Sequence, residues 1–224
     1  MNVGIEYCLA HQPAIEFMFL LDDDDIVYPY FTSMLARAFL VGDADVVYAA
    51  SNRKEPEDAP SPGNLALPIC FLFKQNFIAS NSYAVRLEAL RKSGLRMDET
   101  LEYLEDWHFL LRMVQSGFRF HALPMELSEF RIATARERER NSLPEWRESA
   151  DRIREYIHAG TFSLPGAELA RLDLPAPALE ATESYSLLLR IQELEHSLCW
   201  RWTAPVRQIA GLFQVRAGWP RSGA

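Results

Sequence analysis

Residues 17–25 read FMFLLDDDD, and this stretch decides how the rest of the 224-residue chain is interpreted. A continuous apolar run such as FMFLL is typical of a strand buried on both faces, as in a parallel sheet that is covered by helices. Pro29 suits the first turn of a helix that continues through Phe39. The sequence therefore predicts a strand, an acidic turn and a helix in that order.

Further along the chain, strands and helices are expected to alternate, which is typical of α/β layered domains. The expected strands are residues 45–50 and 118–123, and the expected helices are residues 83–93, 104–116 and 144–158. A polar, proline-rich loop is expected at residues 52–64. Because ligands of such domains bind at the carboxyl ends of strands, the four aspartates occupy the edge where a site is expected.

Composition and charge exclude several classes of protein. The chain has 23 basic and 31 acidic residues, and four of the arginines lie in residues 199–224, which contain no acid. The remainder is therefore strongly acidic and would repel a phosphate backbone, so we expect no nucleic-acid partner. The longest uncharged stretch, residues 59–73, contains three prolines and is shorter than the ~20 residues of a spanning helix.

The cysteines and the amino-terminal residues indicate the cellular compartment. Cys8, Cys70 and Cys199 lie far apart in the sequence, which argues against disulfides and against a thiolate zinc site. The first residues have no basic segment before an apolar run, so a secretory signal is not expected. These features favour a cytoplasmic location.

Two groups of acids are candidates for chemistry. Four consecutive carboxylates repel one another, and a divalent cation such as Mg²⁺ or Mn²⁺ would relieve that repulsion. The alternative is a solvated turn whose acids complement the positive end of the following helix. Glu105 and Asp106 open another expected helix, where acids are favourable in any case, but where a general base would also be held rigidly.

Four segments together resemble bacterial family 2 glycosyltransferases, which have a GT-A fold. Each matches one characteristic stretch of that family, in the same order: the metal-binding strand and turn, the acceptor-side segment, the helix that carries the acidic pair, and the strand that follows. They are residues 17–29 (FMFLLDDDDIVYP), 76–90 (NFIASNSYAVRLEAL), 101–117 (LEYLEDWHFLLRMVQSG) and 118–132 (FRFHALPMELSEFRI).

The resemblance implies a role for each acid. Asp22 and Asp24 match the D-x-D positions, with Asp24 as the direct metal ligand and Asp22 as a second ligand nearer the nucleotide sugar. Asp23 is assigned with Asp22 to the nucleotide-sugar site. Asp106 matches the catalytic base, and Glu105 would support its position. The implied cofactor is a divalent cation, Mn²⁺ or Mg²⁺.

The resemblance also implies a domain organisation and a departure from the family. Relatives place nucleotide-binding strands before the D-x-D strand, whereas here sixteen residues precede Phe17. The expected fold is therefore a partial GT-A α/β domain with a C-terminal helical extension, inactive as it stands. Its expected parts are residues 1–135 (metal and acceptor part), 136–165 (helical segment), 166–181 (proline-rich linker) and 182–224 (amphipathic helix and basic tail).

The C-terminal tail allows two interpretations. Trp200, Trp202 and Trp219 alternate with arginines, which suits peripheral contact with the anionic inner face of a membrane. Alternatively, residues 182–213 pack on the domain or pair with a second copy to form a homodimer.

The leading functional hypothesis is a metal-dependent, inverting glycosyltransferase in bacterial surface polysaccharide synthesis. It would transfer a sugar from a nucleotide-diphosphate donor to a glycan or lipid-linked acceptor. The alternative is a non-catalytic remnant or interaction module that keeps the acceptor half of the fold. A glycoside hydrolase with paired carboxylates is less favoured, because it requires no D-x-D turn.

Overall fold

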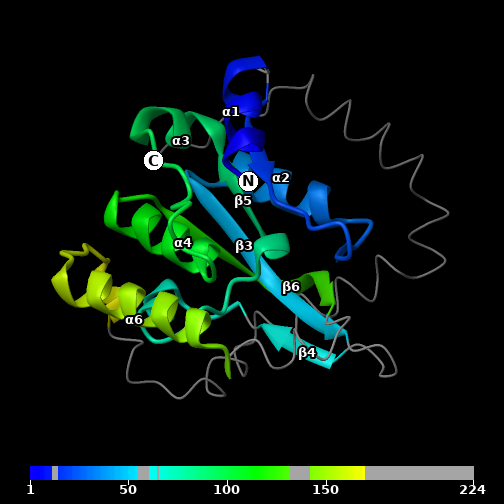
Figure 1. Cartoon of the computed structure of the whole chain (residues 1–224). Coiled ribbons are helices and arrows are strands. Elements are labelled where there is room, and N and C mark those ends of the chain that lie inside the picture. The colour runs from blue at the N-terminus through cyan, green and yellow to red at the C-terminus, as the bar shows by residue number, and fades with distance from the viewer. Residues whose placement is uncertain (12–14, 55–60, 65, 132–141, 170–224) are drawn as a thin grey trace, which may run out of the picture. The chain divides into compact units, whose positions relative to one another are not determined.

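The centre of the protein is a six-stranded mixed sheet (Figure 1). The computed structural model describes residues 1–11, 15–54, 61–64, 66–131 and 142–169, which belong to one compact unit, Met1–Leu179. The strands are β1 (Phe17–Phe19), β2 (Ile26–Val27), β3 (Val46–Lys54), β4 (Ser61–Asn64), β5 (Tyr83–Arg86) and β6 (Phe120–Arg131). Their order is β1-β5-β3-β6-β2, with β4 beside β3. Of these pairs, β3 and β6 run parallel and the others antiparallel.

Helices surround this sheet and short helical turns lie between the strands. The helices are α1 (Asn2–His11), α2 (Phe31–Val41), α3 (Leu87–Ser93), α4 (Glu105–Gln115), α6 (Pro144–Ala159), α7 (Gly166–Leu169) and the 3-10 turns η1 (Ile69–Phe73) and η2 (Ser80–Ser82). None of the described helices is long and apolar enough to cross a bilayer.

Apolar cores lie on both faces of the sheet, because successive side chains of a strand point to opposite faces. In β3, Val46 and Tyr48 belong to one core, and Val47 and Ala49 belong to the other. The helix α2 covers the second core through Phe31, Leu35 and Phe39, whereas α1, α3, α4 and α6 (Pro144–Ala159) contribute to the first. The α/β layered class expected from the sequence is confirmed.

The strand expected at residues 17–21 exists, but its predicted surroundings are wrong. β1 spans Phe17–Phe19, its three residues are half-buried, and it pairs antiparallel with β5. It stands at the end of the strand order, so within the described residues no strand covers its other edge. The apolar run therefore belongs to an edge strand and not to the middle of a parallel sheet.

Two other expected elements differ from the structure. The loop expected at 52–64 is partly a hairpin, because β3 continues to Lys54 and pairs with β4. The helix expected at 83–93 begins only at Leu87, since Tyr83–Arg86 form β5. In that strand Tyr83 and Val85 face one core and Ala84 faces the other, which is the period of a strand.

The remaining expectations agree with the structure where it describes them. Helices occur at α4 and α6, and β6 begins at Phe120, two residues into the strand expected at 118–123, and extends beyond its expected end. Gly94 and Gly117 both have positive φ, 67° and 77°, as expected for glycines that end helices. The expected helix within residues 182–224 and most of the linker at 166–181 lie outside the described residues.

Candidate functional site

The acidic turn, residues 22–25, connects the two end strands of the sheet. β1 precedes it and β2 follows it, so the turn crosses from one edge of the sheet to the other. The N–H of Asp25 donates to the carbonyl of Asp22 (3.2 Å), which closes the turn. Ser80 in η2 donates its hydroxyl to Asp22 Oδ2 (3.4 Å). The acceptor-side segment of the sequence therefore lies beside the turn.

The pKa of Asp25 reflects both its burial and the charges of the other acids in this turn. The pKa of Asp25 is raised to about 6, mainly by burial and also by the charges of Asp22 and Asp24, against hydrogen bonds from the Arg131 N–H (3.1 Å) and from Asn81. Three carboxylates that repel one another favour any cation that binds among them. The burial of Asp25 is a tertiary property, so the sequence alone does not distinguish this residue from the other three aspartates of the turn.

The second acidic pair, Glu105 and Asp106, begins α4 directly after an unusual backbone conformation. Leu104 has φ 62° and ψ 21°, and it is the one non-glycine residue with positive φ in the part of the chain that the structure describes. Leucine rarely adopts this conformation, because its Cβ crowds the backbone. The half-buried Leu104 side chain packs against the core, which holds the turn in place.

Asp106 is oriented by two hydrogen bonds. Its Oδ2 accepts a hydrogen bond from the Asn76 side-chain amide (2.9 Å), and its Oδ1 accepts one from the Trp107 N–H (2.7 Å). The buried Trp107 ring is itself anchored, because Nε1 donates to the carbonyl of Leu72 (2.9 Å). Burial, followed by the charges of Asp106 and Glu105, raises the pKa of Tyr83. Glu105 and Asp106 therefore begin α4 next to side chains that are buried in the core, Trp107 and Tyr83.

One cavity of about 230 Å³ joins the two acidic groups. Its described lining includes acids, polar neutral residues and aromatic residues: Asp22, Glu102, Glu105, Asp106, Asn76, Ser80, Tyr103 and Trp146. The structure thus brings Asp22 together with Glu105 and Asp106, an approach that spacing in the sequence does not reveal. Of the four aspartates in the turn, Asp22 is the one found in this lining.

The donor set of the turn suits a hard cation but is not a complete metal site. Carboxylate oxygens are preferred by Mg²⁺ and Mn²⁺. Within the described residues, however, no group of three or more His, Cys, Asp or Glu side chains is arranged to hold a metal ion. A cation at Asp22 and Asp24 would therefore need further ligands, such as water and a bound diphosphate.

Several residues of the cavity have no recognisable signal in the sequence. Asn76 and Ser80 lie inside the acceptor-side segment, but their residue types do not indicate a role. Tyr103 follows no pattern, and the helical spacing of Trp146 with Ile153 and Ile157 indicates a packed face. A tryptophan at the first turn of an amphipathic helix gives no sequence signal that separates packing from ligand contact.

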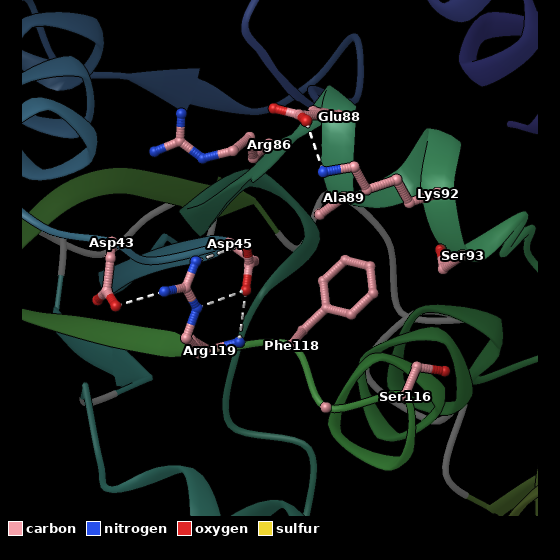
Figure 2. A pocket seen from close by; sticks show the side chains of 11 residues that line it. Asp43, Asp45, Arg86, Glu88, Ala89, Lys92, Ser93, Ser116, Phe118 and Arg119 are labelled. Atoms are coloured by element: carbon pink, nitrogen blue, oxygen red, sulfur yellow. Dashed lines mark hydrogen bonds and ion pairs between the residues drawn. The ribbon is translucent and has the colours of Figure 1, made fainter.

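A second, larger cavity of about 550 Å³ lies away from these acids and is lined by charges of both signs (Figure 2). Its basic side chains already have partners. Arg119 contacts Asp43 and Asp45, and Lys92 Nζ lies 2.6 Å from Glu88. Arg86 donates to the carbonyls of Ala44 and Phe39, both at 3.2 Å. Arg119 connects the segments that precede β3 and β6, and Arg86 of β5 bonds to α2 and to the segment after it. We therefore assign the second cavity to structure and not to ligand binding.

The fold is similar to that of TarS from S. aureus, at low sequence identity. TarS from S. aureus, residues 1–349 in complex with UDP-GlcNAc, is 15% identical over 84% of this chain and 50% of that chain, with a TM-score of 0.50. A second TarS structure is 15% identical over 81% of this chain and 32% of that chain, with a TM-score of 0.51. No family model matches the sequence, and no curated protein is detectably similar to it in sequence. The chain thus spans about half the length of TarS 1–349 and has a glycosyltransferase-like α/β fold.

Proposed function

We propose that this chain carries the metal and acceptor side of an inverting glycosyltransferase that uses a nucleotide-diphosphate sugar. The observation that carries the proposal is the shared cavity, which places Asp22 of the acidic turn beside Glu105 and Asp106 of α4. Donor activation and proton removal must occur within a few ångströms of each other, and this cavity provides groups for both. The TarS structure with UDP-GlcNAc supports a uridine nucleotide sugar as the first donor to test.

Asp24 and Asp22 are the proposed metal ligands. Four consecutive carboxylates in one turn fit Mn²⁺ or Mg²⁺, and the charges of Asp22 and Asp24 contribute, after burial, to the raised pKa of Asp25. When bound, the cation would neutralise the negative charge that develops on the departing nucleoside diphosphate. Asp23 and Asp22 are proposed to contact the nucleotide sugar itself.

Asp106 is the proposed general base. It would accept the proton of the acceptor hydroxyl while that oxygen forms a bond to the anomeric carbon. The bond between the anomeric carbon and the diphosphate oxygen breaks, and its electron pair leaves with the diphosphate. Asn76 holds one oxygen of Asp106, and Glu105 supports its position in the cavity.

Membership in family 2, a role in bacterial surface polysaccharide synthesis and a cytoplasmic location belong to the same proposal. The acceptor would be a glycan or a lipid-linked glycan. Residues 182–213 are proposed to mediate peripheral membrane contact or homodimer formation.

Metal binding tests the acidic turn. Mn²⁺ paramagnetic relaxation and calorimetry on the full chain should detect weak Mn²⁺ binding that UDP strengthens, because diphosphate oxygens complete the ligand shell. Asp24→Ala should remove most of this binding, whereas Asp151→Ala, at an exposed acid of α6, should leave it unchanged. Equal Mn²⁺ affinity in Asp24→Ala and the unaltered chain would contradict the assignment of Asp24.

Measurement of turnover tests whether Asp106 is the general base. In any form that transfers sugar, Asp106→Asn keeps the shape of the side chain but removes proton acceptance, so turnover should fall by ~10² to 10⁴. Product formation is followed by release of the nucleoside diphosphate. Unchanged turnover would reassign Asp106 to the start of α4.

A non-catalytic module is the second candidate. The observation that favours it is the coverage of about half of TarS 1–349, because a donor site can draw on the other half. Such a module would bind saccharides but would bind neither Mn²⁺ with UDP nor a nucleotide sugar. The Mn²⁺ and UDP titration therefore separates the two candidates.

A further inference from the structure

The charge of the shared cavity restricts what can enter it. The lining that the structure describes contains four acids, Asp22, Glu102, Glu105 and Asp106, and includes no lysine, arginine or histidine side chain. Met1 also lines the cavity, so at most one positive group, its α-amino group, faces these four carboxylates. A phosphate or carboxylate close to the attacking hydroxyl would therefore meet net repulsion here. A neutral ligand would not, and its hydroxyl groups could donate hydrogen bonds to these carboxylates.

The same cavity has aromatic residues beside the acids. Trp146, in the first turn of α6, and Tyr103, in the segment before α4, are both half-buried and both line it. An aromatic ring offers a flat apolar surface, and a sugar ring has C–H groups on its faces and hydroxyls around its edge. Pockets that combine aromatic walls with a few polar groups are typical of small-molecule sites.

Packing holds Trp146 in position. Ile153 of α6 is 1% exposed in the core, and Arg152 donates to the carbonyl of Thr100 (2.9 Å). Further along α6, the Tyr156 ring contacts the His108 ring of α4, with centroids 4.7 Å apart. Because these contacts fix α6 against α4 and the segment before it, Trp146 is carried on a rigid element.

We propose that Trp146 is the platform on which one face of an uncharged sugar ring of the acceptor stacks, with its attacking hydroxyl toward Asp106. The acidic lining selects neutral acceptor sugars over sugars that carry phosphate or carboxylate at this position. The volume of about 230 Å³ is suited to one ring, since pockets that bind drug-sized ligands have volumes of roughly 300–1,000 Å³. This inference rests on the proposed function, because it gives the acceptor side of that reaction its substrate class.

Binding of defined sugars to the full chain tests the platform. The probes are methyl β-glucoside, methyl β-galactoside and methyl N-acetyl-β-glucosaminide, with glucose 6-phosphate and methyl β-glucuronide as charged counterparts. Saturation-transfer NMR and titration should show that at least one neutral glycoside binds, and that the charged sugars bind about tenfold more weakly or not at all.

Variants assign the binding to Trp146. Trp146→Ala should weaken the neutral glycoside about tenfold, as expected for loss of a tryptophan contact, and Trp146→Phe should restore most of the affinity. Arg147→Ala, at the exposed neighbouring position, is the matched control. Glu102→Gln should reduce the discrimination against glucose 6-phosphate. Circular dichroism confirms that each variant is folded.

Three results would overturn the inference: no binding of any neutral glycoside, equal or tighter binding of the charged sugars, or unchanged glycoside affinity in Trp146→Ala. These results are independent of the Mn²⁺ and UDP titration. If glycosides bind at Trp146 while Mn²⁺ and UDP do not bind, the sugar platform stands and the transferase proposal fails. If Mn²⁺ and UDP bind while Trp146→Ala has no effect on glycoside binding, the transferase proposal stands and the sugar platform fails.

Discussion

Leu104 is the residue on which the geometry of the cavity depends most directly. Its positive φ turns the chain immediately before Glu105 and Asp106, and its half-buried side chain contacts the core. Residues held in sparsely populated backbone conformations persist only where the surrounding packing stabilises them, and they concentrate at functional sites. Here the unusual conformation of Leu104 sets the direction in which α4 begins, and therefore the positions of Glu105 and Asp106.

A pair of substitutions of similar volume tests this backbone conformation. Leu104→Ile should be less stable than Leu104→Met by about 1–2 kcal/mol, because a β-branched side chain is disfavoured at positive φ. Urea unfolding of both variants measures the difference. Equal free energies of unfolding would mean that α4 starts with an ordinary backbone conformation.

Asp25 should make stability depend on pH. Its folded pKa of about 6 exceeds the ordinary value of 3.8, so the folded state holds the proton more tightly than the unfolded chain does. That contribution is fully present below pH 3.8 and is lost as pH rises through 6. Asp25→Asn should therefore be more stable than the unaltered chain at pH 7.5, by about 1 kcal/mol after discounting for solvent screening.

The pH series for Asp25→Asn is measured by urea unfolding at pH 4, 5.5 and 7.5 with EDTA present, and the stability difference should shrink toward zero at pH 4. Asp151→Asn, at an exposed position of α6, controls for the loss of one negative charge. A difference that does not change with pH would show that the carboxyl of Asp25 titrates normally.

Residue type indicated some parts of the site and gave no signal for others. Asp22 was a candidate because consecutive carboxylates at a strand end repel one another, which a cation would relieve. Glu105 and Asp106 were candidates because a helix start holds a general base rigidly, although acids are favourable there in any case. Trp146 could not be predicted, since its spacing from Ile153 fits core packing equally well. Its contact with the cavity depends on where α6 lies against α4, which is a long-range property of the fold.

At the level of elements, a buried polar junction formed by Ser51, Asn81 and Ser128 connects β3, η2 and β6. The Asn81 side chain is fully buried, its Oδ1 accepts from Ser51 (3.4 Å) and Ser128 (3.2 Å), and its Nδ2 donates to the carbonyl of Glu129 (3.1 Å). Buried polar groups are stable only while they are hydrogen-bonded. The junction therefore ties the acceptor-side segment to two central strands.

Asn81→Ala should destabilise the protein by about 2–3 kcal/mol, because it leaves several buried polar groups without partners. Ser51→Ala should have a smaller effect, since Ser128 still donates to Asn81. Chemical denaturation of the two variants gives the comparison. If Asn81→Ala lowers the free energy of unfolding no more than Ser51→Ala does, Asn81 is not the main hydrogen-bonding residue of the junction.

The elements that sequence predicted well are those whose period repeats over several turns. In α4, Trp107, Leu110, Leu111 and Val114 are all buried, so their helical spacing was informative. β5 was missed because four residues are too few to show alternation before a helix begins. The apolar run of β1 fits a central strand and an edge strand equally well, so strand order could not be obtained from it.

At the level of the whole molecule, exposed apolar surface is concentrated near the start of the chain. Among the described residues, every exposed large hydrophobic side chain lies within residues 1–41: Met1, Val3, Tyr7, Leu21, Leu40 and Val41. They lie in or next to α1 and α2, which cover opposite faces of the sheet, and in the segment after β1, which is itself an end strand. Exposed apolar side chains and an end strand both favour association with another chain.

We therefore expect the 224-residue chain to self-associate as its concentration rises, through residues 1–41. Val3 is 83% exposed and Val41 is 90% exposed, so lysine at both positions should disfavour the contact without disturbing the core. Sedimentation equilibrium should show less association for the Val3→Lys, Val41→Lys variant than for the unaltered chain. The variant Glu148→Gln, Glu155→Gln changes net charge equally at exposed positions of α6, and it should associate as the unaltered chain does. Association that persists in the double lysine variant would contradict this interface and would favour the alternative one proposed for residues 182–213.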